Sequence, residues 1–131
     1  MRYEAVTSHI RVSVQPQFLA DQSAPEDGRY VWAYTIEIAN EGKSTVQLQE
    51  RYWRITDARG KVEEVRGPGV VGETPVLKPG QSFKYTSGCP LQTASGIMAG
   101  NYVMVGEDGV TFTVDVPAFS LDSPFTRRAL H

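Results

Sequence analysis

One stretch decides the fold: Trp32-Ala33-Tyr34-Thr35-Ile36-Glu37-Ile38, in which large apolar side chains alternate with small or polar ones. Successive side chains of a β-strand point to opposite faces, so this period of two predicts a strand with one buried face. The segment Ile10 to Val14 has the same pattern and predicts a second strand. Helical spacing is almost absent, and the only candidate turn, within Leu91 to Ala99, is bounded by Gly96 and Gly100.

Further short strands are predicted on the C-terminal side of this stretch. The next begins at Val46, and its apolar residues change parity within Gln49 to Tyr52, which predicts a β-bulge. The remaining predicted strands are residues 61–66, the neighbourhood of 83–85, 101–105 and 110–116, the last two joined by Glu107-Asp108-Gly109. About seven short strands separated by turns predict an all-β sandwich or a small barrel. Two segments are predicted as loops, the long polar stretch 15–28 and the glycine- and proline-rich stretch 67–80.

Charge and cysteine content limit the functional classes. A formal net charge of -2 is too small to attract nucleic acid or an anionic membrane strongly. The single cysteine, Cys89, cannot form an internal disulfide and suits a reducing compartment. No apolar run is long enough for a secretory signal or a membrane span. We therefore expect a cytoplasmic protein without membrane association.

The string from Gly67 to Gly72 matches the G-x-G-x-x-G pattern of pyrophosphate-binding loops. In dinucleotide folds the glycines open a helix that holds the phosphates, but Pro75 and Pro79 prevent a helix here. Glu73 also places a negative charge at the loop, and no acidic residue follows until Glu107. What remains is a weaker hypothesis, in which the backbone N–H groups of Gly67, Gly69 and Gly72 form an anion-binding nest, helped by Arg66 or Lys78. The alternative is that these glycines only connect the two sheets.

The sequence contains no group of residues typical of a catalytic or metal-binding site. Cys89 would need a base, and only His9 and His131 are available, so we expect a buried, unreactive thiol. Glu63 and Glu64 are neighbours on a predicted strand and point to opposite faces, so they cannot act as an acid–base pair. Two histidines and one cysteine at unrelated positions do not make a zinc site. We expect no enzyme activity, no cofactor and no metal.

The segment Arg51-Tyr52-Trp53-Arg54 interleaves aromatic and basic residues, as a nucleic-acid platform does. Trp53 shares its parity with Ile55 and is predicted to lie in the core. Tyr52 and Arg54 then lie on the opposite face, where they are candidates for a partner contact, with Arg66 from the neighbouring strand. Acidic residues are mixed into this region, so nucleic acid is not the expected partner.

Several strings along the chain together resemble the bacterial ApaG family. They are Ile36-Glu37-Ile38-Ala39-Asn40, Val46-Gln47-Leu48, Arg51-Tyr52-Trp53-Arg54-Ile55-Thr56-Asp57, Val65-Arg66-Gly67-Pro68-Gly69-Val70-Val71-Gly72-Glu73-Thr74-Pro75, Leu77-Lys78-Pro79-Gly80, Phe83-Lys84-Tyr85-Thr86-Ser87-Gly88, Gly96-Ile97-Met98-Ala99-Gly100-Asn101-Tyr102 and Val116-Pro117-Ala118-Phe119. The resemblance implies an immunoglobulin-like or fibronectin type III-like β-sandwich. The resemblance covers about residues 5–121. The chain length fits a single domain over residues 1–131, with this stretch as its core, and we expect residues 122–131 to form a flexible tail.

The resemblance also carries functional expectations. Family members have no established enzyme activity and are associated with cobalt and magnesium tolerance, and similar eukaryotic domains are inferred to bind proteins. Our leading hypothesis is therefore a non-catalytic protein-interaction module with an unidentified protein partner, and exposed sheet edges make a homodimer a further possibility. The alternative hypothesis is a nucleotide- or pyrophosphate-binding protein, linked to dinucleoside polyphosphates, that uses the loop from Gly67 to Gly72.

Overall fold

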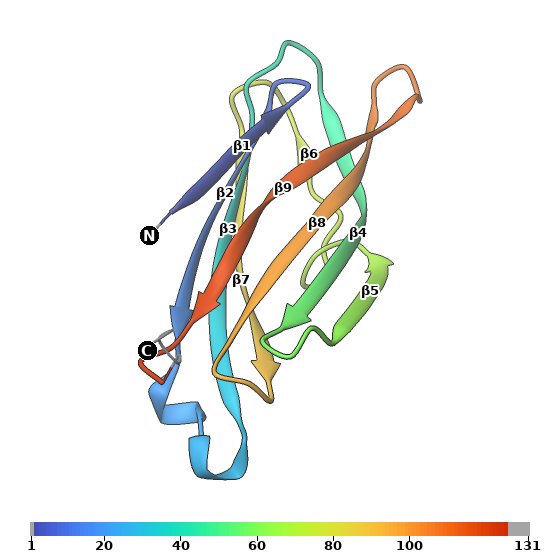
Figure 1. Ribbon diagram of the computed structural model, residues 1–131. Coiled ribbons are helices and arrows are strands. Elements are labelled where there is room, and N and C mark those ends of the chain that lie inside the picture. Colours follow the sequence, from blue (N-terminus) through green and yellow to red (C-terminus); the bar gives the residue numbers. More distant parts are fainter. Residues whose placement is uncertain (1, 126–131) are drawn as a thin grey trace.

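A computed structural model describes residues 2–125, which fold into two antiparallel β-sheets packed face to face (Figure 1). The first sheet contains, in order, β1 (Tyr3–Thr7), β2 (Ile10–Phe18), β3 (Tyr30–Asn40) and β7 (Ser82–Leu91). The second contains β5 (Val62–Pro68), β4 (Val46–Asp57), β8 (Ser95–Gly106) and β9 (Thr111–Asp122), and β6 (Val76–Leu77) pairs with the start of β4. The all-β sandwich is thus confirmed, and its arrangement is compatible with an immunoglobulin-like or fibronectin type III-like type.

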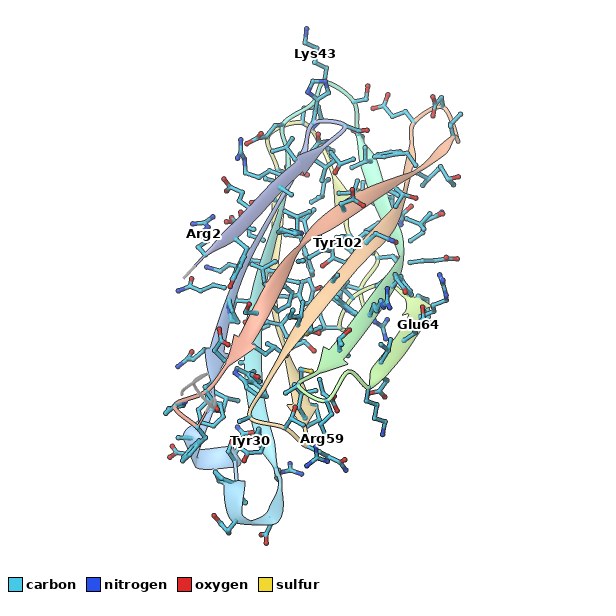
Figure 2. The ribbon with its side chains drawn as sticks, viewed as in Figure 1. Arg2, Tyr30, Lys43, Arg59, Glu64 and Tyr102 are labelled. Atoms are coloured by element: carbon cyan, nitrogen blue, oxygen red, sulfur yellow. The ribbon has the colours of Figure 1, made fainter. Side chains whose placement is uncertain are left out.

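The core lies between the inward faces of the two sheets. Trp32, Tyr34, Ile36 and Ile38 are all buried, as their alternation predicts. Trp53 is also buried, and its ring packs edge-on against Tyr34, with 5.5 Å between the ring centroids. Figure 2 shows Tyr102 in the middle of the molecule, between the two layers. Aromatic packing of this kind stabilises the contact between the sheets beyond the burial of apolar area.

Strands extend further than the sequence patterns predict. β2 continues through Pro16 to Phe18, so the predicted loop at 15–28 is wrong over its first residues; two short 3-10 turns, Ala20–Gln22 and Pro25–Asp27, fill its remainder. Pro16 is tolerated because it faces Tyr34, whose backbone groups point toward β7, so no ladder hydrogen bond is lost. The helical turn considered within 91–99 is also wrong, since β8 begins at Ser95. No helix among the described residues is long and apolar enough to cross a bilayer.

Other strand boundaries also differ from the expectations. The strands β1 and β6 raise the number from about seven to nine. Gly67 and Pro68 belong to β5 rather than to the following loop. At the C-terminal end, β9 includes Asp122, so the expected tail does not begin there, and residues 126–131 lie outside the described part of the chain.

The predicted bulge in β4 is confirmed. The register between β4 and β8 shifts between Leu48 and Glu50, so one extra residue lies on β4 at Gln49. The shift returns the apolar side chains of the second half of β4 to the inner face, where Trp53 joins the core. Arg51 shares the parity of Trp53 and therefore also points inward.

The two long sides of the sandwich differ. On one side the sheets are tied together, because Thr7 Oγ1 of β1 accepts a hydrogen bond of 3.3 Å from the backbone N–H of Asp115 on β9. On the other side, β7 and β5 are the edge strands of their sheets, and no described strand pairs with the outer edge of either. Figure 1 shows β5 at the far end of its sheet from β9. This open side is where a ligand has access to both the core wall and a free strand edge.

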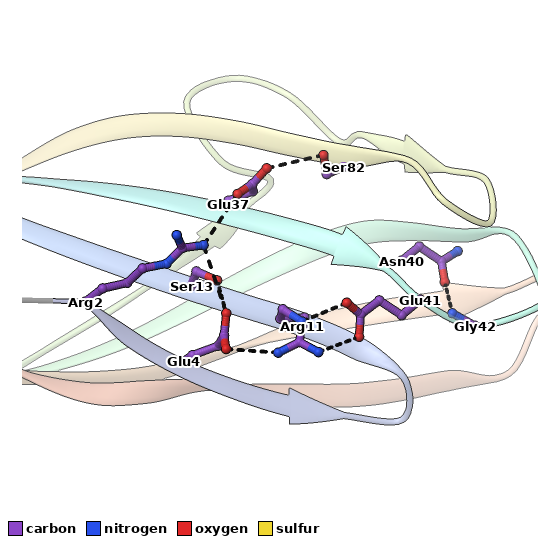
Figure 3. Close-up of polar contacts among 9 residues, drawn as sticks. All are labelled: Arg2, Glu4, Arg11, Ser13, Glu37, Asn40, Glu41, Gly42 and Ser82. Carbon is purple, nitrogen blue, oxygen red and sulfur yellow. Dashed lines mark hydrogen bonds and ion pairs between the residues drawn. The ribbon is translucent and has the colours of Figure 1, made fainter.

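The outer face of the first sheet carries ion pairs (Figure 3). Arg11 donates to both carboxylate oxygens of Glu41, at 2.7 and 2.9 Å, and to Glu4 at 2.9 Å. The hydrogen bond from Arg11 holds the pKa of the Glu41 carboxyl below its usual range. Charges on this face already satisfy one another, so it offers few free groups to a partner.

Two strand glycines give a test of the packing. A Cβ at Gly100 would collide with the carbonyl oxygen of Tyr52 and lie 2.8 Å from the Trp53 ring, whereas at Gly88 its nearest neighbour would be the Trp32 carbonyl oxygen at 3.6 Å. We expect Gly100→Ala to lower the free energy of unfolding by about 1–3 kcal/mol, as overpacking does. Gly88→Ala, the control, should change it by less than about 0.5 kcal/mol. Urea denaturation measures both, and equal stabilities would contradict this packing.

Candidate functional site

Two adjoining hollows form a groove along the open side of the sandwich. One has a volume of about 420 Å³ and the other of about 520 Å³. They share Ile55, Glu63 and Pro90 as lining residues, so they are continuous. The groove runs between β7 of the first sheet and β4 and β5 of the second. We refer to it below as the open-side groove.

The glycine string forms one end of this groove, and no helix follows it. Val70 and Glu73 exchange two backbone hydrogen bonds of 2.8 Å around a tight turn at Val71 and Gly72, which both have positive φ, 43° and 81°. The N–H of Gly69 donates to the Gln49 carbonyl at 2.9 Å. The N–H groups of Gly69, Val70 and Glu73 are therefore already used within the fold. Gly69 is required sterically, because a Cβ there would collide with the Glu73 carbonyl oxygen.

Arg51 supplies the positive charge of the groove. Its Nη1 donates to the carbonyl oxygens of Pro68 and Gly69, at 2.9 and 3.0 Å. The guanidinium crosses directly over Gly67, where a Cβ would lie 3.0 Å from Nη1 and from Nη2. Within residues 2–125, no carboxylate lies within 4.0 Å of this guanidinium. Arg51 is thus a half-buried cation whose hydrogen-bond acceptors within residues 2–125 are backbone carbonyls.

Tyrosine hydroxyls surround this charge. Tyr34 and Tyr85 line the groove, and the Tyr85 hydroxyl lies 2.6 Å from that of Tyr102 in the core behind it. Burial raises the pKa of all three tyrosines, and the charge of Arg51 opposes this in each case. The three hydroxyls therefore stay protonated at neutral pH. The wall of the hollow beside the glycine string offers neutral hydrogen-bonding groups and one cation, Arg51.

Cys89 also faces the groove, and burial keeps its thiol in the protonated form. Burial, with a smaller contribution from Glu63, raises the pKa of its thiol to about 11. His9 lies in the turn between β1 and β2 and lines a different hollow, and His131 lies outside the described residues. Across residues 2–125, no three His, Cys, Asp or Glu side chains gather in a way that could hold a metal ion.

The free edge of β7 forms the rim. Val31 accepts a hydrogen bond from Leu19, the residue directly after β2, so by alternation Trp32 and its partner Cys89 form a hydrogen-bonded pair between β3 and β7. The N–H and C=O groups of Lys84, Thr86 and Gly88 then point away from β3, toward the open side. Pro90 occupies the next such position, where its missing N–H breaks no bond to β3. The rim thus exposes backbone donors and acceptors beside the groove.

The predicted contact residues lie on the other side of β4 and β5. Tyr52, Arg54 and Arg66 do come together on the outer face of the second sheet. The Arg66 guanidinium carbon is 4.3 Å from the centroid of the Tyr52 ring, and the Tyr52 hydroxyl donates to Glu64 (Figure 2 labels Glu64). In this outer-face cluster, Glu64 and Arg66 each contact Tyr52, and within residues 2–125 Arg54 forms no ion pair. Lys78 does not line the groove, and its N–H donates to Gln81.

Arg51 and Gly88 are among the groove residues that the sequence does not single out as site residues. A signal existed for Arg51, because the parity that places Trp53 in the core places Arg51 on the same face. Gly88 gives no local signal, since its position on an edge strand depends on which strands pair.

Comparisons with known proteins agree with this fold. The family model described as the ApaG domain matches residues 20–106. Protein ApaG of Brucella anthropi is 64% identical over 129 residues, covering 98% of this chain and 99% of that protein, and Protein ApaG of Rhodospirillum centenum is 61% identical over 125 residues, covering 95% and 96%. A crystal structure of an ApaA protein from Bordetella pertussis superposes with a TM-score of 0.86 at 49% identity, covering 89% of this chain and 95% of that one.

The raised pKa of Cys89 predicts slow alkylation. With a pKa of about 11, the thiolate fraction at pH 8 is roughly 0.001, against about 0.2 for an unperturbed cysteine. We expect iodoacetamide to label the folded protein at least about 100-fold more slowly than the same protein in guanidinium chloride. Rapid labelling of the folded protein at neutral pH would show that the thiol is activated.

Proposed function

The chain belongs to the ApaG family, and on that premise we propose that it is a non-catalytic binding module whose ligand is another protein. The observation that carries the proposal is the open-side groove, which combines a free strand edge, an apolar wall and the half-buried cation of Arg51. Grooves beside an unpaired strand edge are a recurring way of recognising extended protein segments.

The groove suits a protein ligand better than the outer-face cluster does. In the outer-face cluster, the Tyr52 hydroxyl donates to Glu64 and the Arg66 guanidinium lies over the Tyr52 ring, and exposed charges gain little from a further partner. In the groove, Arg51 has no carboxylate partner among the described residues. We propose that the partner contacts the groove first and that Arg54 and Arg66 are peripheral to it.

We place this role in the cytoplasm, because a buried free cysteine suits a reducing compartment. We propose that the family's association with cobalt and magnesium tolerance is a consequence of partner binding. A homodimer is one form that such binding takes if the partner is a second copy of the chain.

Nucleotide binding is the second candidate, and one observation favours it. The guanidinium of Arg51 lies beneath the glycine string, where it could meet a phosphate that approaches Val71 and Gly72. Against it, three of the loop's N–H groups are occupied by the fold and Glu63 adds negative charge to the same hollow. Calorimetric titration with ATP, GTP and diadenosine tetraphosphate distinguishes the two candidates. Saturable binding lost in Arg51→Gln, with the fold intact, would favour the nucleotide.

The groove proposal predicts a contrast between two surface variants. Gly88→Glu places a charged side chain at the rim, where the structure has room for a Cβ, and Arg54→Glu places one on the outer face. In affinity capture from a native lysate, we expect wild-type and Arg54→Glu proteins to retain the same partner and Gly88→Glu to lose it. Urea denaturation checks that both variants fold. Loss of the partner in Arg54→Glu alone would move the site to the outer face.

A further inference from the structure

We propose that the open-side groove takes an extended peptide segment that pairs with the free edge of β7 and sets a carboxylate side chain against Arg51. This inference rests on the proposed function and specifies the chemistry of its partner. Three independent features carry it: the unpaired backbone groups of β7, a glycine that the fold does not need, and a cation without an acidic partner.

The free edge of β7 sets the binding mode. Lys84, Thr86 and Gly88 each present an N–H and a C=O toward the open side, and Pro90 presents a C=O. These groups repeat every second residue, which is the spacing that an added strand requires. A segment of about five or six residues, the usual length of a strand, can pair along this edge. The added strand would extend the first sheet across the groove.

Gly88 marks the point of closest approach. Its φ is not positive, and a Cβ would meet nothing closer than the Trp32 carbonyl oxygen at 3.6 Å, so neither backbone geometry nor packing demands a glycine. Glycine inside a strand weakens it, and it often marks a site where another backbone approaches closely. Gly88 also lines the groove itself. Gly88 has the parity of Lys84 and Thr86, so we infer that its missing side chain leaves room, on the outer face of the first sheet, for a side chain of the added strand.

Arg51 sets the chemistry of the ligand. Its guanidinium is half-buried, donates through Nη1 to two carbonyls, and has no carboxylate within 4.0 Å in the described chain. A partly desolvated guanidinium gains most from a carboxylate, which forms short, charge-assisted hydrogen bonds with it. Side chains of an added strand that point inward would face the second sheet, to which Arg51 belongs. One acidic side chain at that position completes the pair.

The remaining charges of the groove favour a peptide over a polyphosphate. The adjoining hollow is lined by three carboxylates, Asp27, Asp57 and Glu63, against two cations, Arg29 and Lys61. A polyanion extended along the groove would meet these carboxylates, whereas a peptide brings its negative charge to Arg51 alone. A second copy pairing through its own β7 would bring no acid, because residues 82–91 contain neither Asp nor Glu.

A peptide selection tests the inference directly. We would select random nine-residue peptides displayed on phage against the folded protein and measure the affinity of the winners by fluorescence anisotropy. We expect an acidic residue at one fixed position, between residues that are apolar or β-branched. Replacing that Glu by Gln in the peptide should weaken binding by about 10- to 100-fold, the range for a charge-assisted hydrogen bond.

Arg51 also holds the glycine turn, so its replacement could weaken binding indirectly. A double-mutant cycle separates a direct contact between Arg51 and the peptide carboxylate from this structural support. In Arg51→Gln, the Glu and Gln peptides should bind equally, while Arg54→Gln, the control, should keep the full preference for Glu. If Arg51→Gln weakens both peptides and leaves their ratio unchanged, Arg51 only supports the turn, and the carboxylate assignment is wrong.

A second pair of variants tests strand addition. Thr86→Pro removes an edge N–H, and Thr86→Val removes the hydroxyl bonded to Thr35 but keeps that N–H. We expect Thr86→Pro to lose peptide binding and Thr86→Val to retain it, with both variants folded. Equal binding by the two would overturn the strand-addition mode.

The outcomes distinguish this inference from the proposed function. If no peptide is selected while lysate capture still depends on Gly88, the groove binds protein but not in this way, and only the inference fails. If capture depends on Arg54 instead, the proposed function fails at this site. Sedimentation over a range of concentrations identifies the remaining occupant: a dimer that Thr86→Pro dissociates means that a second copy fills the edge, which also overturns the peptide assignment.

Discussion

The extra residue at Gln49 is the constraint on which the rest of the structure depends. Side chains alternate along β4, so without the shift between Leu48 and Glu50 the second half of the strand would turn its apolar side chains to solvent. With the shift, Trp53 reaches Tyr34, Tyr102 and Phe119 and ties the two layers together. The same shift turns Arg51 inward. One local irregularity therefore supplies both the centre of the core and the charge of the groove.

The sandwich is closed on one side and open on the other, and the sequence explains this asymmetry. On the closed side, short polar contacts such as those of Thr7 and Tyr3 with the backbone of β9 hold the layers together. On the open side, no described strand pairs with the outer edges of β7 and β5, and the tight turn at Val71 and Gly72 lies at one end of the groove. Binding sites on rigid scaffolds commonly combine fixed strands with such turns. The groove is a product of this topology rather than of any single motif.

Much of the fold follows from local patterns, but the site does not. Alternation around Trp32 to Ile38 predicts the central strand, and the parity change predicts the bulge, because both depend only on which face is buried. The predicted boundaries of β2 and β8 are wrong because Pro16 and Gly96 suggest loop where the structure has strand. Proline is harmless where its N–H would face away from the neighbouring strand, and a Cβ at Gly96 would lie 2.8 Å from the Thr56 carbonyl oxygen, so that glycine serves packing inside a strand. The parity correctly places Tyr52 and Arg54 on the outer face. Their pairing with Glu64 and the open edge of β7 depend on which distant strands lie side by side, so local patterns do not predict them.

An edge that stays available to a ligand is also a hazard, because unpaired strands of identical molecules can stack into aggregates. β7 carries two features that oppose this without covering the edge. The charge of Lys84 makes indiscriminate stacking of like strands unfavourable, and the absent N–H of Pro90 interrupts the row of donors before the strand ends. These two features oppose pairing between the β7 edges of identical molecules while leaving the edge itself exposed.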